Sequence, residues 1–494
     1  MTKASPSVRR EPADHAAPPA HADLAVASSS YRVPALVLLG FGLWWFIGAA
    51  LLHTAALVKL HAPELLAAWP WFTYGRLQPA AWNALVFGFC VPAGMVVAAV
   101  VCAQSARAPL LGGRGMIVAG LFWNIGLAIG LVGILAGDST GTPALELPRY
   151  VAPIMFAACA VLAACPLISF FWCFREQGPL VLLYCLGSFF VLPWFYGAGL
   201  FATVFLPMRG VLQASAQAWF VHGLTVVWCG LTGLGVLFHL VPQASGVPLP
   251  SRAAAVFSFW TLIVFGGLGA LQRLQGGPFP AWMSATGTAA SVLSVLAVCG
   301  TLLNFVLMLR GSRRGGARFG ARPYVIAAIS FFSAAMVVQA LSSLPAVGFL
   351  VQFTPLQTAI ETALLVGFLT VTVLGAVMES GPELVGAGGP WPRWRRGQFA
   401  SVLLGVVLVV GGLGVGGVRM GLAWNNSAMT AYDVSRQQIP FVGVTVMGWL
   451  LLWVAGLIAG ANAVCVLVYR WRRVWRPAIA GWVKDTSRSE EVGA

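Results

Sequence analysis

Twelve apolar runs, each long enough to cross the hydrocarbon layer of a membrane, constrain this chain of 494 residues more than any other feature. A transmembrane helix needs about 20 mostly apolar residues, and such segments can be found by hydropathy. They lie roughly at 34–57, 82–105, 115–136, 150–173, 179–206, 217–242, 254–275, 284–309, 324–347, 355–379, 400–423 and 443–469. The sequence therefore predicts an all-α, polytopic membrane protein with a twelve-helix transmembrane bundle.

The composition leaves little room for a soluble catalytic domain, because 59% of the residues are apolar and 9% are charged. Residues 1–30 are rich in Ala, Pro, Ser and charge, which predicts a disordered cytoplasmic tail. We expect the membrane domain to occupy residues 31–470 and a basic cytoplasmic tail to occupy 471–494.

The distribution of basic residues predicts the orientation of the bundle. With both termini in the cytoplasm, 22 of the 29 Lys and Arg residues fall on the inner side, as the positive-inside rule requires. The net charge of +15 then reflects topology and contact with anionic lipid, and nucleic-acid binding is not predicted. We expect a multi-pass protein of a bacterial-type inner membrane. The outward residues are Lys59, Arg76, Arg149, Arg209, Arg273, Arg419 and Arg436.

All nine cysteines lie in apolar runs and none forms a CxxC pair, so they are expected to be small buried hydrophobic residues. In the eleventh run, small residues recur at four-residue spacings. They include Gly412, Gly416 and Gly417, and they predict close helix packing.

Polar residues inside the apolar runs are the candidate functional groups, because each is costly in lipid. The predicted orientation places His222, Gln272–Arg273 and Glu361–Thr362 in the outer third of spans six, seven and ten, where three helices can meet at one depth. His239 is seventeen residues beyond His222, or about 25 Å along a helix, and is expected at the cytoplasmic interface. The full set is His222, Gln272, Arg273, Gln275, Gln339, Gln357, Glu361, Thr362 and Glu379.

Four long stretches, in their order and spacing, resemble subunit I of haem-copper oxidases, in particular the cbb3-type cytochrome c oxidases. Smaller similarities at Gly300, Asn304 and "TAYD" extend the resemblance over nearly the whole chain beyond residue 30. It implies the twelve-span fold of that subunit, and its cofactors would be haem b and copper. The stretches are "YGRLQPAAWNALVF" (74–87), "AWFVHGLTVVWCGLTGLGVLFHLVP" (218–242), "FWTLIVFGGLGALQRLQGGPFPAW" (259–282) and the run from Ser330 and Phe331 through "LVQFTPLQTAIETALLVGFLTVTVLGA", which ends at 376 and covers spans nine and ten.

The same resemblance shows that this chain departs from the family at its haem ligands. The positions of the haem-binding histidines are Ala81, Ile360 and Thr362. None of these residues can serve as a strong axial ligand of haem iron. The family's span-seven tyrosine and span-nine glutamate correspond to Gly266 and Val338.

The copper ligands are also largely replaced. Of the three implied histidines only His222 remains, and Gln272 and Arg273 stand at the other two positions. A lone imidazole beside a fixed positive charge is a poor copper site. No catalytic residue, no haem and no copper are therefore predicted.

The replacement residues suggest a polar cluster of His222, Arg273 and Glu361. Buried charges persist mainly when they are paired, so Glu361 is expected to pair with Arg273 or His222. The cluster is then either structural repair of a vacated cavity or a polar pocket that binds a ligand or relays protons.

Three functions remain open on the sequence alone. The first is a cofactor-free, non-catalytic paralogue that acts as a subunit or assembly partner in a respiratory electron-transfer complex, docking other subunits or a cytochrome c-like protein through its outer aromatic loops. The second is a haem-containing oxidoreductase with unusual ligands. The third is a transporter that reuses the cavity, although spans two and four lack ionisable residues to line a polar path.

Overall fold

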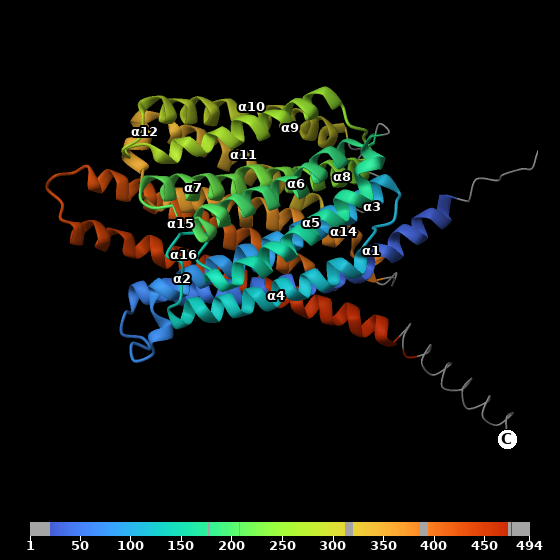
Figure 1. The fold of residues 1–494 in the computed structure, drawn as a ribbon, viewed down its shortest axis with the longest axis horizontal. Helices are drawn as coiled ribbons and strands as arrows, with labels where there is room; N and C mark the ends of the chain where they lie inside the picture. Colours follow the sequence, from blue (N-terminus) through green and yellow to red (C-terminus); the bar gives the residue numbers. More distant parts are fainter. Residues whose placement is uncertain are drawn as a thin grey trace, which may run out of the picture.

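The computed structural model describes residues 20–175, 178–206, 208–311, 320–385, 394–472 and 476. Within them, twelve helices are long and apolar enough to cross a membrane, so the predicted number of spans is confirmed. The helices run side by side along the long axis of the molecule (Figure 1). The described helices are α1 (Ala20–His61), α2 (Tyr74–Asn83), α3 (Val91–Ala106), α4 (Gly113–Ala136), α5 (Ala152–Arg175), α6 (Leu180–Leu200), α7 (Val211–His222), α8 (Cys229–Ser245), α9 (Arg252–Leu268), α10 (Ala281–Gly311), α11 (Arg322–Ser343), α12 (Pro345–Val351), α13 (Leu356–Thr362), α14 (Val371–Val385), α15 (Arg395–Trp424) and α16 (Ala431–Arg470).

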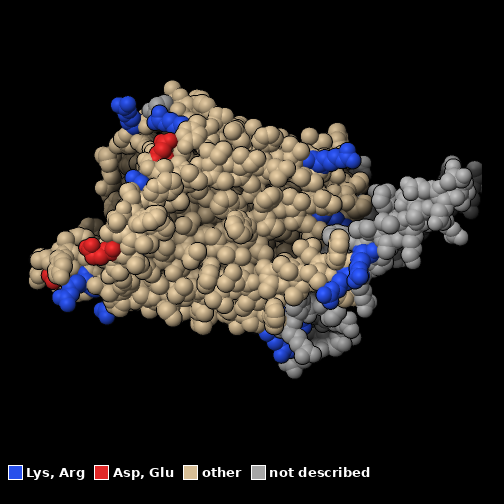
Figure 2. All heavy atoms as spheres, turned by 90° about the horizontal axis from the view of Figure 1, so that it is seen from below, with Lys and Arg blue, Asp and Glu red and all other residues tan. Residues whose placement is uncertain are grey.

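The start of α1 and the end of α16 lie at the same end of the bundle, which we call the termini end (Figure 1). The opposite end, the loop end, carries the connections around residues 62–73, 137–148 and 425–430. Figure 2 shows Lys and Arg side chains at both ends and few charges on the broad band between them. This band has the character expected of a surface that faces lipid.

The helix α1 begins at Ala20, so the last part of the predicted N-terminal tail is helical, whereas the apolar span itself begins at Ser28, close to the predicted boundary. The segment "AHADLAVASSS" has no Pro or Gly, and its alanines and leucine favour helix, so the first span can extend beyond the apolar run. Residues 1–19, and the C-terminal tail beyond 472 except residue 476, lie outside the described part of the chain.

Spans two, six and ten form the centre of the bundle. The most apolar windows of the first two are entirely buried, and that of span ten is mostly buried. Each central span changes from α- to π-helical geometry in mid-course, at η2 (Ala84–Cys90), η5 (Gly223–Trp228) and η7 (Ala363–Thr370). The changes in spans six and ten fall directly after positions 222 and 362, and the change in span two begins three residues after position 81. π-Helical segments are rare and are often found at functional sites.

Two side chains, one from span six and one from span ten itself, donate to backbone carbonyls in the π-helical segment η7. Cys229 donates its thiol to the carbonyl of Leu364 at 3.2 Å, and the Thr370 hydroxyl donates to that of Leu365 at 2.9 Å. All nine cysteines are free. Five of them are buried, as expected, but Cys165 and Cys173 are only half-buried and Cys299 and Cys465 are exposed.

The glycines of α15 provide the close helix packing that their spacing predicts. A Cβ atom at Gly412 would come within 2.9 Å of the Phe441 carbonyl oxygen on α16, and one at Gly416 within 3.0 Å of the Phe441 side chain. Gly417 lies directly against the backbone of Leu356 at the start of α13. These glycines therefore bring α15 close to both span twelve and span ten.

Candidate functional site: a polar cluster between spans six, seven and ten

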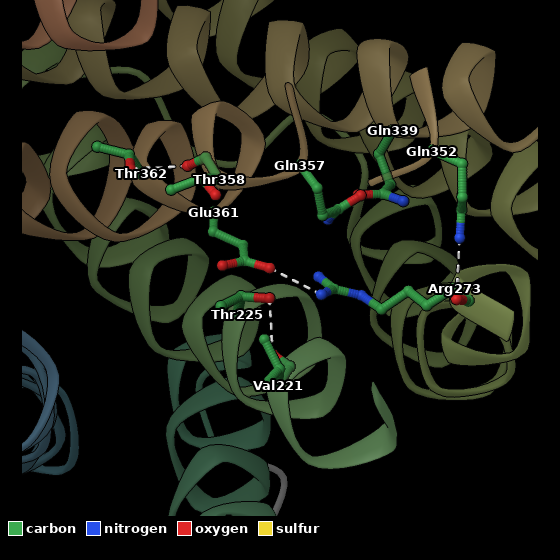
Figure 3. Close-up of polar contacts among 9 residues, drawn as sticks. All are labelled: Val221, Thr225, Arg273, Gln339, Gln352, Gln357, Thr358, Glu361 and Thr362. Carbon is green, nitrogen blue, oxygen red and sulfur yellow. Dashed lines mark hydrogen bonds and ion pairs between the residues drawn. The ribbon is translucent and has the colours of Figure 1, made fainter. Parts of the chain in front are cut away.

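A single ion pair lies at the centre of the candidate site. Arg273 Nη1 donates to Glu361 Oε1 at 2.7 Å, and both side chains are largely buried, with 13% and 14% exposed. Arg273 lies on the 3₁₀ segment η6 (Gly269–Leu274), which ends span seven, and Glu361 lies on α13. Figure 3 shows the arginine reaching across to the carboxylate above Thr225 of span six. Of the two partners considered for Glu361, the structure places Arg273 against it.

His222 is buried close to this pair but takes no part in it. Its Nδ1 atom makes no hydrogen bond in the protein. Its Nε2 atom packs against Gly269, where an added Cβ would come within 2.9 Å. The three polar positions therefore meet at one depth, as expected, but only Arg273 and Glu361 are bonded to each other.

Glutamine side chains surround the arginine. Gln352 Nε2 donates to the backbone carbonyl of Arg273 at 3.1 Å, and Gln357 Nε2 donates to Gln339 Oε1 at 3.3 Å. Gln272 is buried beside Arg273. Gln339 is the neighbour of Val338, so the span-nine region also contributes to the cluster (Figure 3).

Two cavities flank the ion pair. One, the span-two cavity, has a volume of about 370 Å³ and is lined by residues that include His53, Gln78, Trp82, Glu361 and Thr362. The other, the span-seven cavity, has a volume of about 290 Å³ and is lined by Gln217, Gln272, Arg273, Gln352 and Gln357, among others. Phe353, which is 87% exposed, lines both cavities. Both therefore reach the loop end of the bundle.

The haem-ligand positions do not fit an iron-bound haem. Ala81 and Ile360 are buried and offer only alkyl groups. The Thr362 hydroxyl donates to the Thr358 carbonyl at 2.7 Å, so it is engaged within its own helix. Haem iron requires imidazole, thiolate, thioether or phenolate ligands, and these three side chains supply none.

The copper-ligand positions do not fit copper either. His222 Nδ1 is the one unbonded imidazole nitrogen there, and the guanidinium of Arg273 is directed at Glu361. In the described part of the chain, no three His, Cys, Asp or Glu side chains are grouped in a way that could hold a metal ion. An amide and a guanidinium cannot replace two imidazoles as copper ligands.

His239 lies at the other end of span six from His222, as its spacing predicts. It is buried within the protein, where polar residues of α3 and of its own helix α8 contact it. Ser105 Oγ lies 2.8 Å from its Nδ1, and Gln104 Oε1 lies 3.1 Å from its Nε2. This histidine therefore belongs to a separate structural network.

His53 of span one is a site residue that the predicted set does not include. Its ring stacks on Trp449 of span twelve, with centroids 4.0 Å apart, and it lines the span-two cavity. Its Nε2 atom and the Oε1 atom of Gln78 make no hydrogen bond in the protein. The sequence does carry a signal, because His53 is an ionisable residue inside the first apolar run. Only the fold shows which helices it faces.

Glu146 lies in the loop between spans three and four and forms a hydrogen bond with span two. It accepts a hydrogen bond of 2.7 Å from Nδ2 of Asn83. Asn83 lies two residues after Ala81 in span two. Burial raises the pKa of its carboxyl group above the ordinary value of 4.5, and this effect outweighs the opposing hydrogen bond from Asn83. The folded protein therefore binds the Glu146 proton more tightly than the unfolded chain does.

This raised pKa predicts a pH-dependent stability. Below pH 4.5 the carboxyl group is protonated in both states, and its stabilising effect is lost as the pH rises through the folded-state pKa. We expect the midpoint of thermal unfolding to fall over that interval less steeply in Glu146→Gln than in the parent protein. Parallel midpoint curves for the two proteins between pH 4 and about pH 7 would contradict this prediction.

The class of protein follows from this geometry: a twelve-span membrane protein with a polar centre between spans two, six, seven and ten. The family model described as "Cytochrome C and Quinol oxidase polypeptide I" matches residues 33–463. The chain therefore belongs to the family of haem-copper oxidase subunit I.

Individual relatives are distant but match over most of their length. The chain is 23% identical to cytochrome c oxidase subunit 1 of Rhodobacter capsulatus over 420 residues, which is 79% of this chain and 76% of the relative. It is 20% identical to the cbb3-type cytochrome c oxidase subunit CcoN1 of Stutzerimonas stutzeri over 467 residues, or 88% and 92% of the two chains. A solved haem-copper terminal oxidase dimer has the same fold, with a TM-score of 0.69 and 15% identity, covering 90% of this chain and 84% of that one.

Proposed function

We propose that this protein is a cofactor-free, non-catalytic paralogue of oxidase subunit I, located in a bacterial-type inner membrane with both termini in the cytoplasm. It serves as a subunit or assembly partner of a respiratory electron-transfer complex. The observation that carries the proposal is the ion pair between Arg273 and Glu361. It occupies the region bracketed by the family's ligand positions, and those positions hold Ala81, Ile360 and Thr362.

The backbone supports descent from a cofactor-binding ancestor. The three central spans keep π-helical segments that begin at Ala84, Gly223 and Ala363, within three residues after positions 81, 222 and 362. Such segments weaken a helix and persist only where packing or function maintains them. A chain that lost its ligands but kept the surrounding packing is expected to retain this backbone and the family fold.

The loop end provides a surface for a partner protein. The loop after span one exposes a group of apolar and aromatic side chains, comprising Leu65, Leu66, Trp69, Trp71 and Phe72. Aromatic residues are enriched both at membrane interfaces and in protein interfaces. In the proposed orientation this surface faces outward, where another subunit or a cytochrome c-like protein docks.

One observation favours a second candidate, a haem protein with an unusual ligand. His53 lines the span-two cavity and has an unbonded Nε2 atom. An imidazole is a strong haem ligand. In this alternative, His53 holds a haem in the cavity that also contacts Thr362.

An absorption spectrum with metal analysis of the purified protein separates the two candidates. We expect no Soret band and no copper at stoichiometric amounts, because the family's ligand positions supply no donor set. Stoichiometric haem would overturn the proposal. In that case a His53→Ala variant that loses the band would identify His53 as the ligand, whereas an unchanged band would exclude it.

A further inference from the structure

The guanidinium of Arg273 has one edge that no group in the described part of the chain satisfies. Its Nη1 atom binds Glu361, but Nε and Nη2 are buried without a hydrogen bond. The N–H bonds of Nε and Nη2 point in parallel from that edge and match the two oxygens of a carboxylate. A buried charged donor without a partner is costly, so this edge is suited to a ligand that supplies acceptor atoms.

The span-seven cavity adjoins this arginine and contains further donors. The amides of Gln217, Gln272 and Gln357 line it, and Gln339 Nε2 behind Gln357 is also buried without a hydrogen bond. Figure 3 shows the unsatisfied edge of Arg273 on the side facing Gln357. The unsatisfied atoms of Arg273 and Gln339 are all donors, whereas those of His53 and Gln78 beside the span-two cavity include the acceptor Gln78 Oε1.

We propose that the span-seven cavity binds the carboxylate of a small organic acid. The two carboxylate oxygens accept from Nε and Nη2 of Arg273, and the amides of Gln357 and Gln339 donate to the same oxygens. A volume of about 290 Å³ is enough for an acid of a few carbon atoms together with water.

Access to the arginine edge requires only a small side-chain movement. Gln357 lies over that edge and is held by one long hydrogen bond of 3.3 Å to Gln339. Rotation of this amide opens the edge to the cavity, and the exposed Phe353 lies where the cavity meets the loop end. Arg273 then lies between two carboxylates, Glu361 and the ligand, which predicts moderate affinity because Glu361 already neutralises the arginine charge.

Titration of the purified full-length protein with sodium acetate tests the site. Sodium chloride and sodium sulfate at equal ionic strength serve as controls, and binding is followed by calorimetry and by broadening of the ¹³C-acetate resonance. We expect saturable binding of one acetate per chain. Arg273→Lys keeps the charge but removes the two-point edge, so it is expected to weaken binding about tenfold or more.

Two further variants distinguish a binding role of Arg273 from a structural one. Glu361→Gln removes the competing carboxylate and is expected to tighten acetate binding. Gln357→Glu places an internal carboxylate beside the arginine edge, so acetate binding should disappear while the chain stays folded. Arg419→Lys, at an exposed arginine in a neighbouring apolar region, is the matched control and should bind like the parent protein.

Absence of saturable acetate binding, or binding that Arg273→Lys and Gln357→Glu leave unchanged, would overturn the proposal. Equal binding of sulfate or nitrate would also overturn the carboxylate assignment, because it would show a site for any oxyanion. The site does not depend on the protein being cofactor-free. The acetate titration can therefore contradict the carboxylate site, and the absorption spectrum can contradict the cofactor-free function, independently of each other.

Discussion

Glu361→Leu is expected to lower the free energy of unfolding by about 3 kcal/mol, because it leaves the Arg273 guanidinium without its partner among buried groups. Removing one member of a fully buried pair typically costs about 3–5 kcal/mol. The lower end applies because 13% of the Arg273 side chain and 14% of the Glu361 side chain remain exposed. The measurement is the midpoint of thermal unfolding in detergent micelles, followed by tryptophan fluorescence.

The double variant Arg273→Met/Glu361→Leu is the control for this prediction. Replacing both charges with apolar groups of similar size removes the unpaired charge, so its stability should lie within about 1 kcal/mol of the parent protein. A single variant as stable as the parent would show that the ion pair contributes little. A double variant less stable than Glu361→Leu would show that packing contributes more than charge to the stability of this region.

Gly287→Ala is expected to destabilise the protein by about 3 kcal/mol and to displace the candidate site, because overpacking at a backbone contact cannot be relieved by a side-chain rotation. Gly287 lies on α10, and an added methyl group would overlap the backbone of Leu271 and Gln272. These residues immediately precede Arg273 on η6. We therefore expect a lower unfolding midpoint together with weaker acetate binding.

Gly267, twenty residues earlier on span seven, provides a matched control. A Cβ atom there has no neighbour within 4 Å, so Gly267→Ala should change stability by less than about 1 kcal/mol, and in the stabilising direction if it reduces the freedom of the unfolded chain. Equal effects of Gly287→Ala and Gly267→Ala would contradict the close contact between α10 and η6.

Only some residues of the candidate site could be predicted from the sequence. Arg273 and Glu361 were recognisable because charges in apolar spans are rare and require partners. Periodicity does not identify the partner, which depends on how far the 3₁₀ turn at the end of span seven carries Arg273 towards α13. The place of His53 in the site is not predictable for the same reason, because its stacking partner Trp449 lies in the last span of the chain.

The sequence by itself determined the twelve spans, the helical class and the family, because bilayer thickness dictates the length of an apolar helix and long-range order of motifs identifies the family. The tertiary structure alone decided that Arg273 pairs with Glu361, that its other edge has no partner, and that a cavity lies on each side of the pair. The physical reason is that pairing and cavities depend on side-chain packing between distant spans, whereas hydrophobicity acts on each span separately.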